Sequence, residues 1–407
     1  MEVDGSLSDG TRAPQPAIRS GVSLLYVATV PAPIRNFFIP YAIHFRALGW
    51  RVDAAASGAA AVRELRDAFD HVYELPLTRS VLDVKGIVRG ERAIATLLET
   101  EPDIVHVHTP IAAFVTRAAV HRLPVDRRPA VAYTAHGFHF HRGGRAAANA
   151  LFLTAERVAG RWTDRLVVIN DEDERAALDH RIVPRGRLVR MPGVGLDTDS
   201  YAPSSVALCD VVRVRERLGA GPDTPVFVVV AELHRNKRQE DAIAALALMR
   251  HQQARLALVG EGRERDRLQQ SMARHGVTDR VRYLGFVKDV RPALRAATAL
   301  ILPSSREGLA RSIMEALALE VPVIASTARG NRELVGADSG LVFPIGDVRG
   351  LADAMDWLVD HPEEARQMGL CGRRRMMERY DLGTLIRMHE QMYAQLLAQH
   401  RRGGRLP

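Results

Sequence analysis

Two carboxylates within residues 299–319 carry the strongest chemical signal of the sequence. Glu307 and Glu315 stand eight positions apart. Before them, the apolar run 300–302 suits a buried strand, and from Arg311 onward apolar residues recur at helical spacing, which predicts a strand, a loop and a helix. Because helical side chains lean toward the helix N-terminus, we expect Glu315 to lie near Glu307 at the mouth of the loop.

The same mouth also suits an anion. A helix start presents free N–H groups and a partial positive charge. Carboxylates only accept hydrogen bonds and fit sugar and ribose hydroxyls, whereas the N–H groups fit a diphosphate. A nucleotide sugar carries both kinds of group. The spacing alone leaves a second interpretation open, in which Glu307 is an ordinary loop residue and Glu315 a solvated helix residue.

A histidine follows a predicted strand in the first half of the chain. Residues 130–134 run into His136 and Gly137, and the glycine permits a ligand to approach the backbone closely. His136 is suited to donate a hydrogen bond to a sugar hydroxyl or a phosphate. His139 and His141 follow, but neither a carboxylate nor a cysteine joins the three at ligand spacing, so a metal site is the weaker interpretation. A purely structural His136 also stays open.

Lys237 is the basic candidate in the second half of the chain. It precedes a predicted helix that begins at Glu240, at the edge where Glu307 is expected, and its ammonium is suited to neutralise a departing diphosphate. A solvated lysine is the alternative. The next two strands end in glycines that allow backbone groups to approach a ribose or a base, although a Gly-x-Gly by itself is weak evidence: Gly260, Gly262 and Gly285.

The surrounding pattern predicts an α/β chain, in which short apolar strands alternate with helices as in parallel sheets covered on both faces. In the first half we expect strands near residues 22–29, 51–55, 71, 104–107, 130–134 and 166–169. In the second half we expect strands near residues 225–231, 254–259, 281–284, 300–302, 321–325 and 341–343. The turn-rich segment 191–205 separates the two sets.

The expected domain organisation follows from that separation. Residues 1–19 are expected to form a disordered tail, residues 20–195 an N-terminal domain and residues 206–380 a C-terminal domain, both doubly wound. The last helix, at about 381–400, is apolar on one side and is expected to cross back to the first domain. Ligands of such folds bind beyond the carboxyl ends of the strands, so two facing domains predict a cleft.

Length and composition narrow the function classes. The 407 residues suit two or three domains, and no apolar run approaches the roughly 18 residues of a membrane helix. The start of the chain lacks the apolar middle of a signal peptide, so we expect a cytoplasmic location. The two cysteines are too few for a disulfide framework.

The formal charge of +8 and the pI near 9.9 predict an anionic partner. No nucleic-acid motif accompanies the charge, so we expect no nucleic-acid partner. Arginines crowd the end of the first half, either as a solvated surface or as a patch that attaches the protein to the inner face of the cytoplasmic membrane: Arg142, Arg145, Arg157, Arg161, Arg165, Arg181, Arg185, Arg187 and Arg190.

Residues 307–315 read EGLARSIME and resemble the Glu-x7-Glu signature of retaining glycosyltransferases of family four, which have the GT-B fold of two Rossmann-like domains. His136 resembles the active-site histidine of that family, and Lys237 resembles the basic residue of its donor-phosphate clamp. The resemblance covers nearly all of the chain after residue 20. Three segments look most like those of bacterial exopolysaccharide and capsule transferases that extend lipid-linked sugars: residues 134–140, 231–233 and 308–312.

The resemblance implies a role for each candidate residue. Glu307 would hold hydroxyls of the donor sugar, Glu315 would hold the ribose, and Lys237 would hold the diphosphate with the N–H groups near 310–312. His136 would contact the donor sugar near the reacting carbon, so the implied catalytic residues are His136, Glu307 and Lys237. The implied donor-binding residues are Glu315, Arg235, Gly260, Gly262, Phe286, Val287, Gly308, Leu309, Ala310, Arg311 and Ser312. The acceptor-side candidates are Arg35, Asn36, His108 and His139.

The resemblance also implies the partners of the reaction. The donor would be a uridine diphosphate sugar, the acceptor a polyprenyl-diphosphate-linked saccharide, and no metal or other cofactor would be needed. Two departures from the family pattern bear on this. The family often has an arginine where this chain has Glu232, and it often has paired glycines in the loop at 30–36, where this chain has none. They leave open how the donor charge is met and how the acceptor is held.

Two other functions stay open. A nucleotide-sugar epimerase or hydrolase would need the same groups and would act without an acceptor. A catalytically silent nucleotide-sugar-binding subunit would fit the two departures. The acidic segments 171–173 and 197–199 resemble the Asp-x-Asp metal motif of other transferases, but the first begins a helix and the second lies in the linker, so we interpret both as structural.

Overall fold

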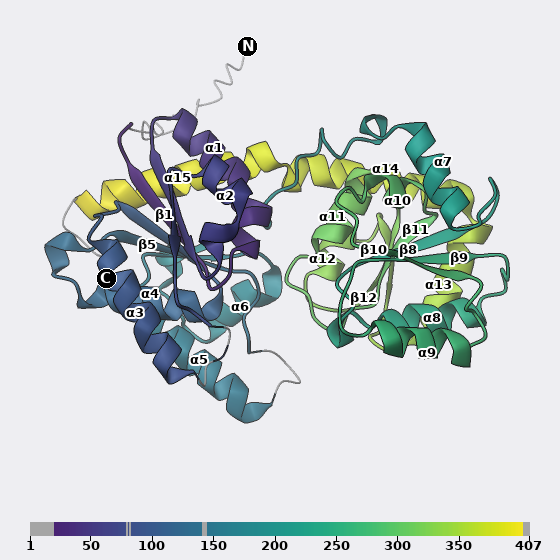
Figure 1. Cartoon of the computed structure of the whole chain (residues 1–407), viewed down its shortest axis with the longest axis horizontal. Helices are drawn as coiled ribbons and strands as arrows, with labels where there is room; N and C mark the ends of the chain where they lie inside the picture. The colour runs from purple at the N-terminus through teal and green to yellow at the C-terminus, as the bar shows by residue number, and fades with distance from the viewer. Residues whose placement is uncertain (1–19, 79, 81–82, 141–144, 402–407) are drawn as a thin grey trace, which may run out of the picture.

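The computed structural model describes residues 20–78, 80, 83–140 and 145–401 and contains two parallel sheets, one in each half of the chain (Figure 1). The expected tail at 1–19 lies outside the described residues. The first sheet has seven strands in the order β3-β2-β1-β4-β5-β6-β7. Its strands are β1 (Ser23–Val27), β2 (Arg51–Ala56), β3 (His71–Glu74), β4 (Ile104–His108), β5 (Ala130–Ala135), β6 (Arg165–Val168) and β7 (Leu188–Arg190).

The second sheet has six strands in the order β10-β9-β8-β11-β12-β13. Its strands are β8 (Val226–Val230), β9 (Arg255–Val259), β10 (Val281–Gly285), β11 (Ala299–Leu302), β12 (Val323–Ser326) and β13 (Gly340–Phe343). Twelve of the strands correspond to predicted ones. The sequence analysis missed β7, because its three residues are only partly buried and adjoin the turn-rich segment.

Helices cover both faces of each sheet because successive strand side chains point in opposite directions. In β1, Leu24 and Tyr26 face one core with helices α1, α2 and α15, whereas Leu25 and Val27 face another with α3 and α4. The helices of this half are α1 (Ile39–Ala47), α2 (Arg63–Ala68), α3 (Val84–Leu98), α4 (Pro110–Arg122), α5 (Ala146–Gly160) and α6 (Asp171–Asp179). A π-helical turn, Ile34–Phe38, precedes α1.

The second sheet is covered in the same way. Phe227 and Val229 of β8 face a core with α8, α9 and α13, and Val226 and Val228 face the opposite side. The helices are α7 (Leu208–Arg217), α8 (Gln239–Leu248), α9 (Arg265–Arg274), α10 (Arg291–Arg295), α11 (Arg311–Ala318), α12 (Asn331–Val335), α13 (Val348–Asp360) and α14 (Pro362–Arg375).

The last helix, α15 (Leu382–Arg401), returns to the N-terminal half, as predicted (Figure 1). Its Leu385, Met392 and Leu396 are buried in the core under β1. At its far end, the Gln399 side chain accepts a hydrogen bond from Arg165 at 2.7 Å. The chain therefore crosses between the two halves twice, once before α7 and once into α15.

The strand order identifies where ligands should bind. In both sheets the order reverses beside the first strand, between β1 and β4 and between β8 and β11. A crevice opens beyond the carboxyl ends of the strands at such a point. Within the ranges that the structure describes, no helix combines the length and the apolar character needed to span a bilayer.

Candidate active site

Lys237 and Glu307 meet at the reversal point of the second sheet. Lys237 follows β8, Glu307 follows β11, and the Lys237 Nζ donates to Glu307 Oε1 at 2.7 Å. The carboxylate side chain is only 10% exposed and that of the lysine 25%. The Glu307 carboxylate therefore holds the Lys237 ammonium near the loop that leads into α11. Ala310, at the N-cap of α11, has no side chain that could cap the helix.

Asn236 explains why these two loops meet. Its side-chain amide donates to the Arg306 carbonyl at 2.8 Å, and its own carbonyl accepts from the Ser305 backbone at 2.8 Å. These bonds tie the residue before Lys237 to the residues before Glu307. The sequence analysis did not single out Asn236, because an asparagine in a loop is common and its partner lies 70 positions away.

Glu315 lies one turn into α11 and is 7% exposed. Its Oε1 accepts from the Tyr201 hydroxyl at 2.9 Å and from Arg311 Nε at 2.8 Å. Burial and the neighbouring carboxylate raise the pKa of Tyr201, so its hydroxyl keeps its proton and donates. Arg311 also donates to the carbonyl of Asn36 at 2.9 Å, which joins α11 to the N-terminal half.

His136 faces this region from the end of β5. A Cβ built on Gly308 would lie 2.1 Å from the His136 carbonyl oxygen, so the loop after β11 packs directly on the loop after β5 and only glycine fits there. A cavity of about 300 Å³ lies at this junction. Its lining includes Phe37, His136, His139, Gly308, Leu309 and Arg311. The structure thus brings His136 together with the segment that follows Glu307.

His108 lies behind His136 and has no exposed surface. Its Nδ1 is 3.2 Å from Nε2 of His136. The side chain therefore does not reach the acceptor surface where the sequence analysis placed it. Burial lowers the pKa of His108 well below its usual range and, with a contribution from His389, lowers the pKa of His136 to about 4. Both rings are neutral at physiological pH.

The other acceptor-side candidates lie closer to the surface. Part of the His139 side chain is exposed, but protein atoms crowd its ring, and this partial desolvation, together with the positive charge of Arg306, lowers its pKa. Arg35 and Asn36 are exposed in the π-helical turn before α1, where the Arg35 guanidinium donates to the Asn36 side chain at 3.2 Å. His139 lines the cavity, whereas Asn36 reaches it through the bond from Arg311 to its carbonyl.

The remaining donor-side candidates surround the ends of β8, β9 and β10. A Cβ on Gly260 or Gly262 would lie 2.1 or 2.3 Å from the carbonyl oxygens of Ala231 and Leu233, so close packing of two loops already requires these glycines. Phe286 is 72% exposed, and Val287 is partly buried next to it. The Arg235 side chain is 76% exposed and pairs with Glu264 at 3.4 Å. Contact of these residues with a nucleotide stays a prediction.

Asp173 makes a contact that sequence analysis missed. As predicted, the acidic segment 171–173 begins a helix, α6. Asn170 caps this helix because its side chain accepts a hydrogen bond from the Asp173 backbone N–H. The Asp173 side chain is fully buried and accepts from Arg329 of the C-terminal half at 2.7 Å, while Arg329 also donates to the Phe138 carbonyl at 3.0 Å. Nothing in the sequence marks Arg329, because its partner lies 156 positions away.

The other acidic segment closes a turn. Asp197 accepts hydrogen bonds from the backbone of Asp199 and Ser200, in agreement with a structural role. Among the residues that the structure describes, no three histidine, cysteine, aspartate or glutamate side chains are placed to hold a metal ion. His141 lies outside those residues.

Two family models match the chain. Residues 41–199 match Glycosyltransferase Family 4, and residues 212–375 match Glycosyl transferases group 1. The putative glycosyltransferase EpsD of Bacillus subtilis is 32% identical over 369 residues, which cover 90% of this chain and 94% of that protein. A galactosyltransferase of Escherichia coli is 26% identical over 69% of this chain and 71% of its own.

Solved structures agree on the fold. HepE of Anabaena superposes with a TM-score of 0.77 at 19% identity, over 92% of this chain and 100% of that one. Sucrose-phosphate synthase of Thermosynechococcus elongatus gives 0.78 at 21% identity, over 92% and 99%. The fold is therefore GT-B, with two Rossmann-like sheets. With the match to EpsD over nearly its whole length, this chain belongs to the family 4 glycosyltransferases.

Proposed function

We propose that this glycosyltransferase moves a sugar from a uridine diphosphate donor, with retention, to a lipid-linked saccharide during synthesis of a cell-surface polysaccharide. The observation that carries the proposal is the Lys237–Glu307 ion pair, which adjoins Gly308 where Gly308 packs on His136. A cationic group for a diphosphate is thus bonded to the loop that packs on His136, a neutral hydrogen-bonding group for a sugar.

The chemistry follows from those groups. When the sugar–phosphate bond breaks, negative charge grows on the diphosphate, and the Lys237 ammonium and the start of α11 stabilise that charge where it develops. Glu307 holds the lysine and accepts hydrogen bonds from donor hydroxyls, and Glu315 accepts them from the ribose. His136 donates to the sugar. Closure of the two halves removes water, which would otherwise compete with the acceptor.

The similar proteins support the choice of donor and acceptor. The Escherichia coli relative is named UDP-Gal:alpha-D-GlcNAc-diphosphoundecaprenol alpha-1,3-galactosyltransferase, and HepE has been crystallised with UDP and with UDP-glucose. EpsD is named a putative glycosyltransferase. These names favour a uridine diphosphate sugar as the donor and a polyprenyl-diphosphate-linked saccharide as the acceptor. We propose that neither a metal ion nor another cofactor takes part.

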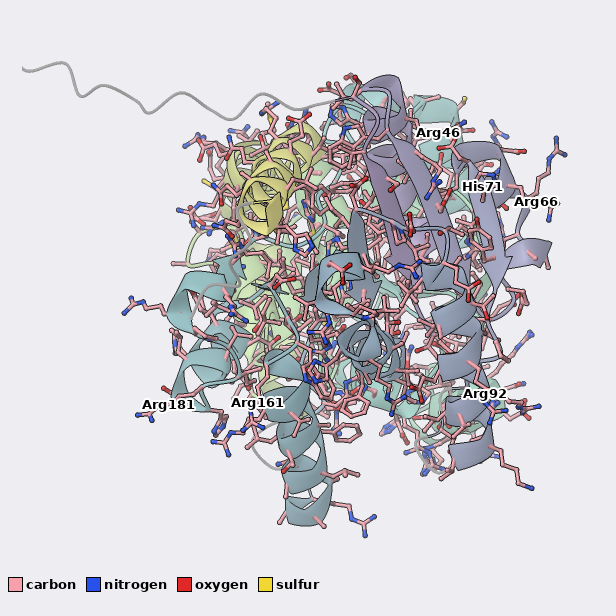
Figure 2. The ribbon with its side chains drawn as sticks, turned by 90° about the vertical axis from the view of Figure 1, so that its left-hand side faces the viewer. Arg46, Arg66, His71, Arg92, Arg161 and Arg181 are labelled. Atoms are coloured by element: carbon pink, nitrogen blue, oxygen red, sulfur yellow. The ribbon has the colours of Figure 1, made fainter. Side chains whose placement is uncertain are left out.

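Attachment to the inner face of the cytoplasmic membrane is part of the proposal. Of the arginines in the first half, Arg165 and Arg187 are buried, so the patch is smaller than the sequence suggested. Arg157, Arg161 and Arg181 are exposed around a surface hollow of about 470 Å³, and Figure 2 shows Arg161 and Arg181 at one side of the N-terminal half. If these charges attach the protein to the membrane, the fraction of protein that pellets with anionic vesicles should fall as the salt concentration rises.

The function is tested by offering a panel of nucleotide sugars with membrane extract as the acceptor and identifying the products by mass spectrometry. We expect one uridine diphosphate sugar to extend a lipid-linked saccharide, in the presence of a metal chelator as well as without it. His136→Ala and Glu307→Ala should each reduce the amount of product strongly. Sugar release or isomerisation without acceptor would favour an epimerase or hydrolase, and unchanged product from both variants would favour a silent binding subunit.

A further inference from the structure

We propose that His108 is a positioning residue that fixes which ring nitrogen of His136 carries the proton, so that the Nδ1–H of His136 is presented to the ligand cavity as a donor. The inference rests on the proposed function in one respect, because that function supplies the sugar that receives the bond. The evidence for the proton arrangement itself is independent of any substrate.

The surroundings of His108 set up the argument. The ring is fully buried, and within the residues that the structure describes its Nε2 has no hydrogen-bond partner. The Phe38 ring lies 4.2 Å away between centroids and the Tyr26 ring 5.8 Å. Among the same described residues, the ring makes one hydrogen bond, between its Nδ1 and Nε2 of His136 at 3.2 Å.

Only one tautomer of His108 suits these surroundings. A neutral imidazole carries one N–H and one bare nitrogen. If the proton were on Nε2, a buried N–H would have no acceptor, which is rare in folded proteins and costs its full desolvation. With the proton on Nδ1, His108 donates to His136 and the nitrogen without a partner is a bare acceptor. His108 Nδ1–H is therefore the donor and His136 Nε2 the acceptor.

The tautomer of His136 follows directly. The Nε2 of His136 accepts the hydrogen bond from His108 and is therefore unprotonated. A neutral His136 then carries its own proton on Nδ1. Within the described part of the chain, this Nδ1 has no protein partner and is not enclosed, and the ring lines the cavity at the junction of the two halves. A sugar hydroxyl or a phosphate oxygen in that cavity would accept from it.

Further buried groups keep this arrangement neutral and fixed. On the same strand, His106 is bonded on both sides, to the Tyr393 hydroxyl at 2.5 Å and to the Thr134 hydroxyl at 2.7 Å, and its ring lies 4.3 Å from that of His108. His389 of α15 is also buried. Burial lowers the pKa of His106 and of His389, so the cluster carries no charge that would reverse the donor and acceptor roles.

The test reads the tautomers directly. In the full chain labelled with ¹⁵N-histidine, long-range ¹H–¹⁵N spectra at neutral pH report which nitrogen is protonated, and His136→Ala assigns the signals of His136. We expect the Nδ1–H form of His136 in the wild type and in His108→Asn, whose side-chain amide can donate from the position of Nδ1. In His108→Leu we expect a mixture of tautomers. His389→Leu, a matched change at a buried histidine without a bond to His136, should leave the Nδ1–H form.

Kinetics give the second readout. His108→Leu should lower kcat/KM about tenfold, the scale of one hydrogen bond, while His108→Asn stays within about threefold. In the His136→Ala background, His108→Leu should have no further effect, because the two residues act through one bond. An Nε2–H wild type, or an unchanged tautomer in His108→Leu, would overturn the proposal. If no sugar is transferred at all, the proposed function fails, and the spectra still decide the role of His108.

Discussion

The two sheet edges that meet at the cavity differ in their chemistry. The edge of the C-terminal half is charged, with Lys237 and Glu307 paired at 2.7 Å and Glu315 bonded to Arg311. The edge of the N-terminal half is neutral, with buried histidines packed against aromatic rings. A charged diphosphate suits the first edge, and sugar hydroxyls, which need oriented but uncharged partners, suit the second.

The two edges also differ in where their residues come from. The charged edge is assembled from loops after neighbouring strands β8 and β11, and Asn236 ties these loops together. The neutral edge needs residues from β4, β5 and the last helix α15, whose Tyr393 supports His106 from 287 positions away. A substitution at the charged edge should therefore lower activity with little loss of stability. Substitutions at the neutral edge should lower the stability of the fold as well.

Removing the charge of Lys237 should have the largest effect. Lys237→Ala takes away the cation that meets the departing diphosphate, and we expect kcat/KM to fall about a thousandfold, as for loss of one preorganised electrostatic donor. The measurement is steady-state transfer with the donor identified by the product screen. Arg235→Ala is the control, because its side chain is 76% exposed in a loose pair with Glu264, and it should lose less than tenfold. Equal losses would contradict a special role for Lys237.

The contact that joins the two halves should come next. Arg329→Met removes the partner of the fully buried Asp173 carboxylate, and leaving a buried charge without its partner should cost about 3 kcal/mol of stability. Urea unfolding at neutral pH measures the loss.

Asp173→Asn supplies the control for that contact. If the two groups act as a pair, the double variant should be much less destabilised than the sum of the single variants. Additive losses would show that Arg329 and Asp173 stabilise the protein separately, and the two edges would then lack this link.

The sequence predicted the charged edge better than the neutral one for a physical reason. Strand periodicity places the loops after successive strands at a common edge, so Lys237 and Glu307 could be assigned to one edge from the order of strands alone, and the structure pairs them. Burial and long-range pairing cannot be obtained that way. His108 ends β4 much as His136 follows β5, yet the structure places His108 behind the site. The contact of Arg329 with Asp173 depends on how the two halves pack.

Acid should destabilise the fold through the buried histidines of the neutral edge. The loss of stability per histidine should be smaller than the loss expected for Arg329→Met. The pKa of His389 is about 4 in the folded protein because the ring is buried, against roughly 6.5 when unfolded. Between these values the unfolded chain binds the proton that the folded chain excludes, so the stability present above pH 6.5 is lost as pH falls toward 4. At pH 5.5 His389 alone should account for about 1 kcal/mol.

Urea midpoints at pH 7.5, 6.5 and 5.5 test this. His389→Leu should reduce the fall in stability between pH 7.5 and 5.5, because the variant has one fewer histidine whose pKa is lower in the folded chain than in the unfolded chain. His275→Leu changes an exposed histidine and should leave the slope as in the wild type. A wild type whose stability is constant over this range would contradict a neutral histidine cluster.

The smallest change tests whether the charged edge is as local as its sequence signature suggests. Tyr201, from the segment before α7, donates to Glu315 Oε1, and so does Arg311. Tyr201→Phe removes one neutral hydrogen bond and leaves the charged one, so the donor KM should rise about threefold with kcat unchanged. Steady-state kinetics with varied donor measure this. Arg311→Gln should raise the donor KM more than Tyr201→Phe does, because Arg311 also donates a hydrogen bond to the Asn36 carbonyl of the opposite half. If Tyr201→Phe lowers kcat instead, Glu315 acts on the departing diphosphate as well as on the ribose, and the charged edge depends on a residue outside its signature.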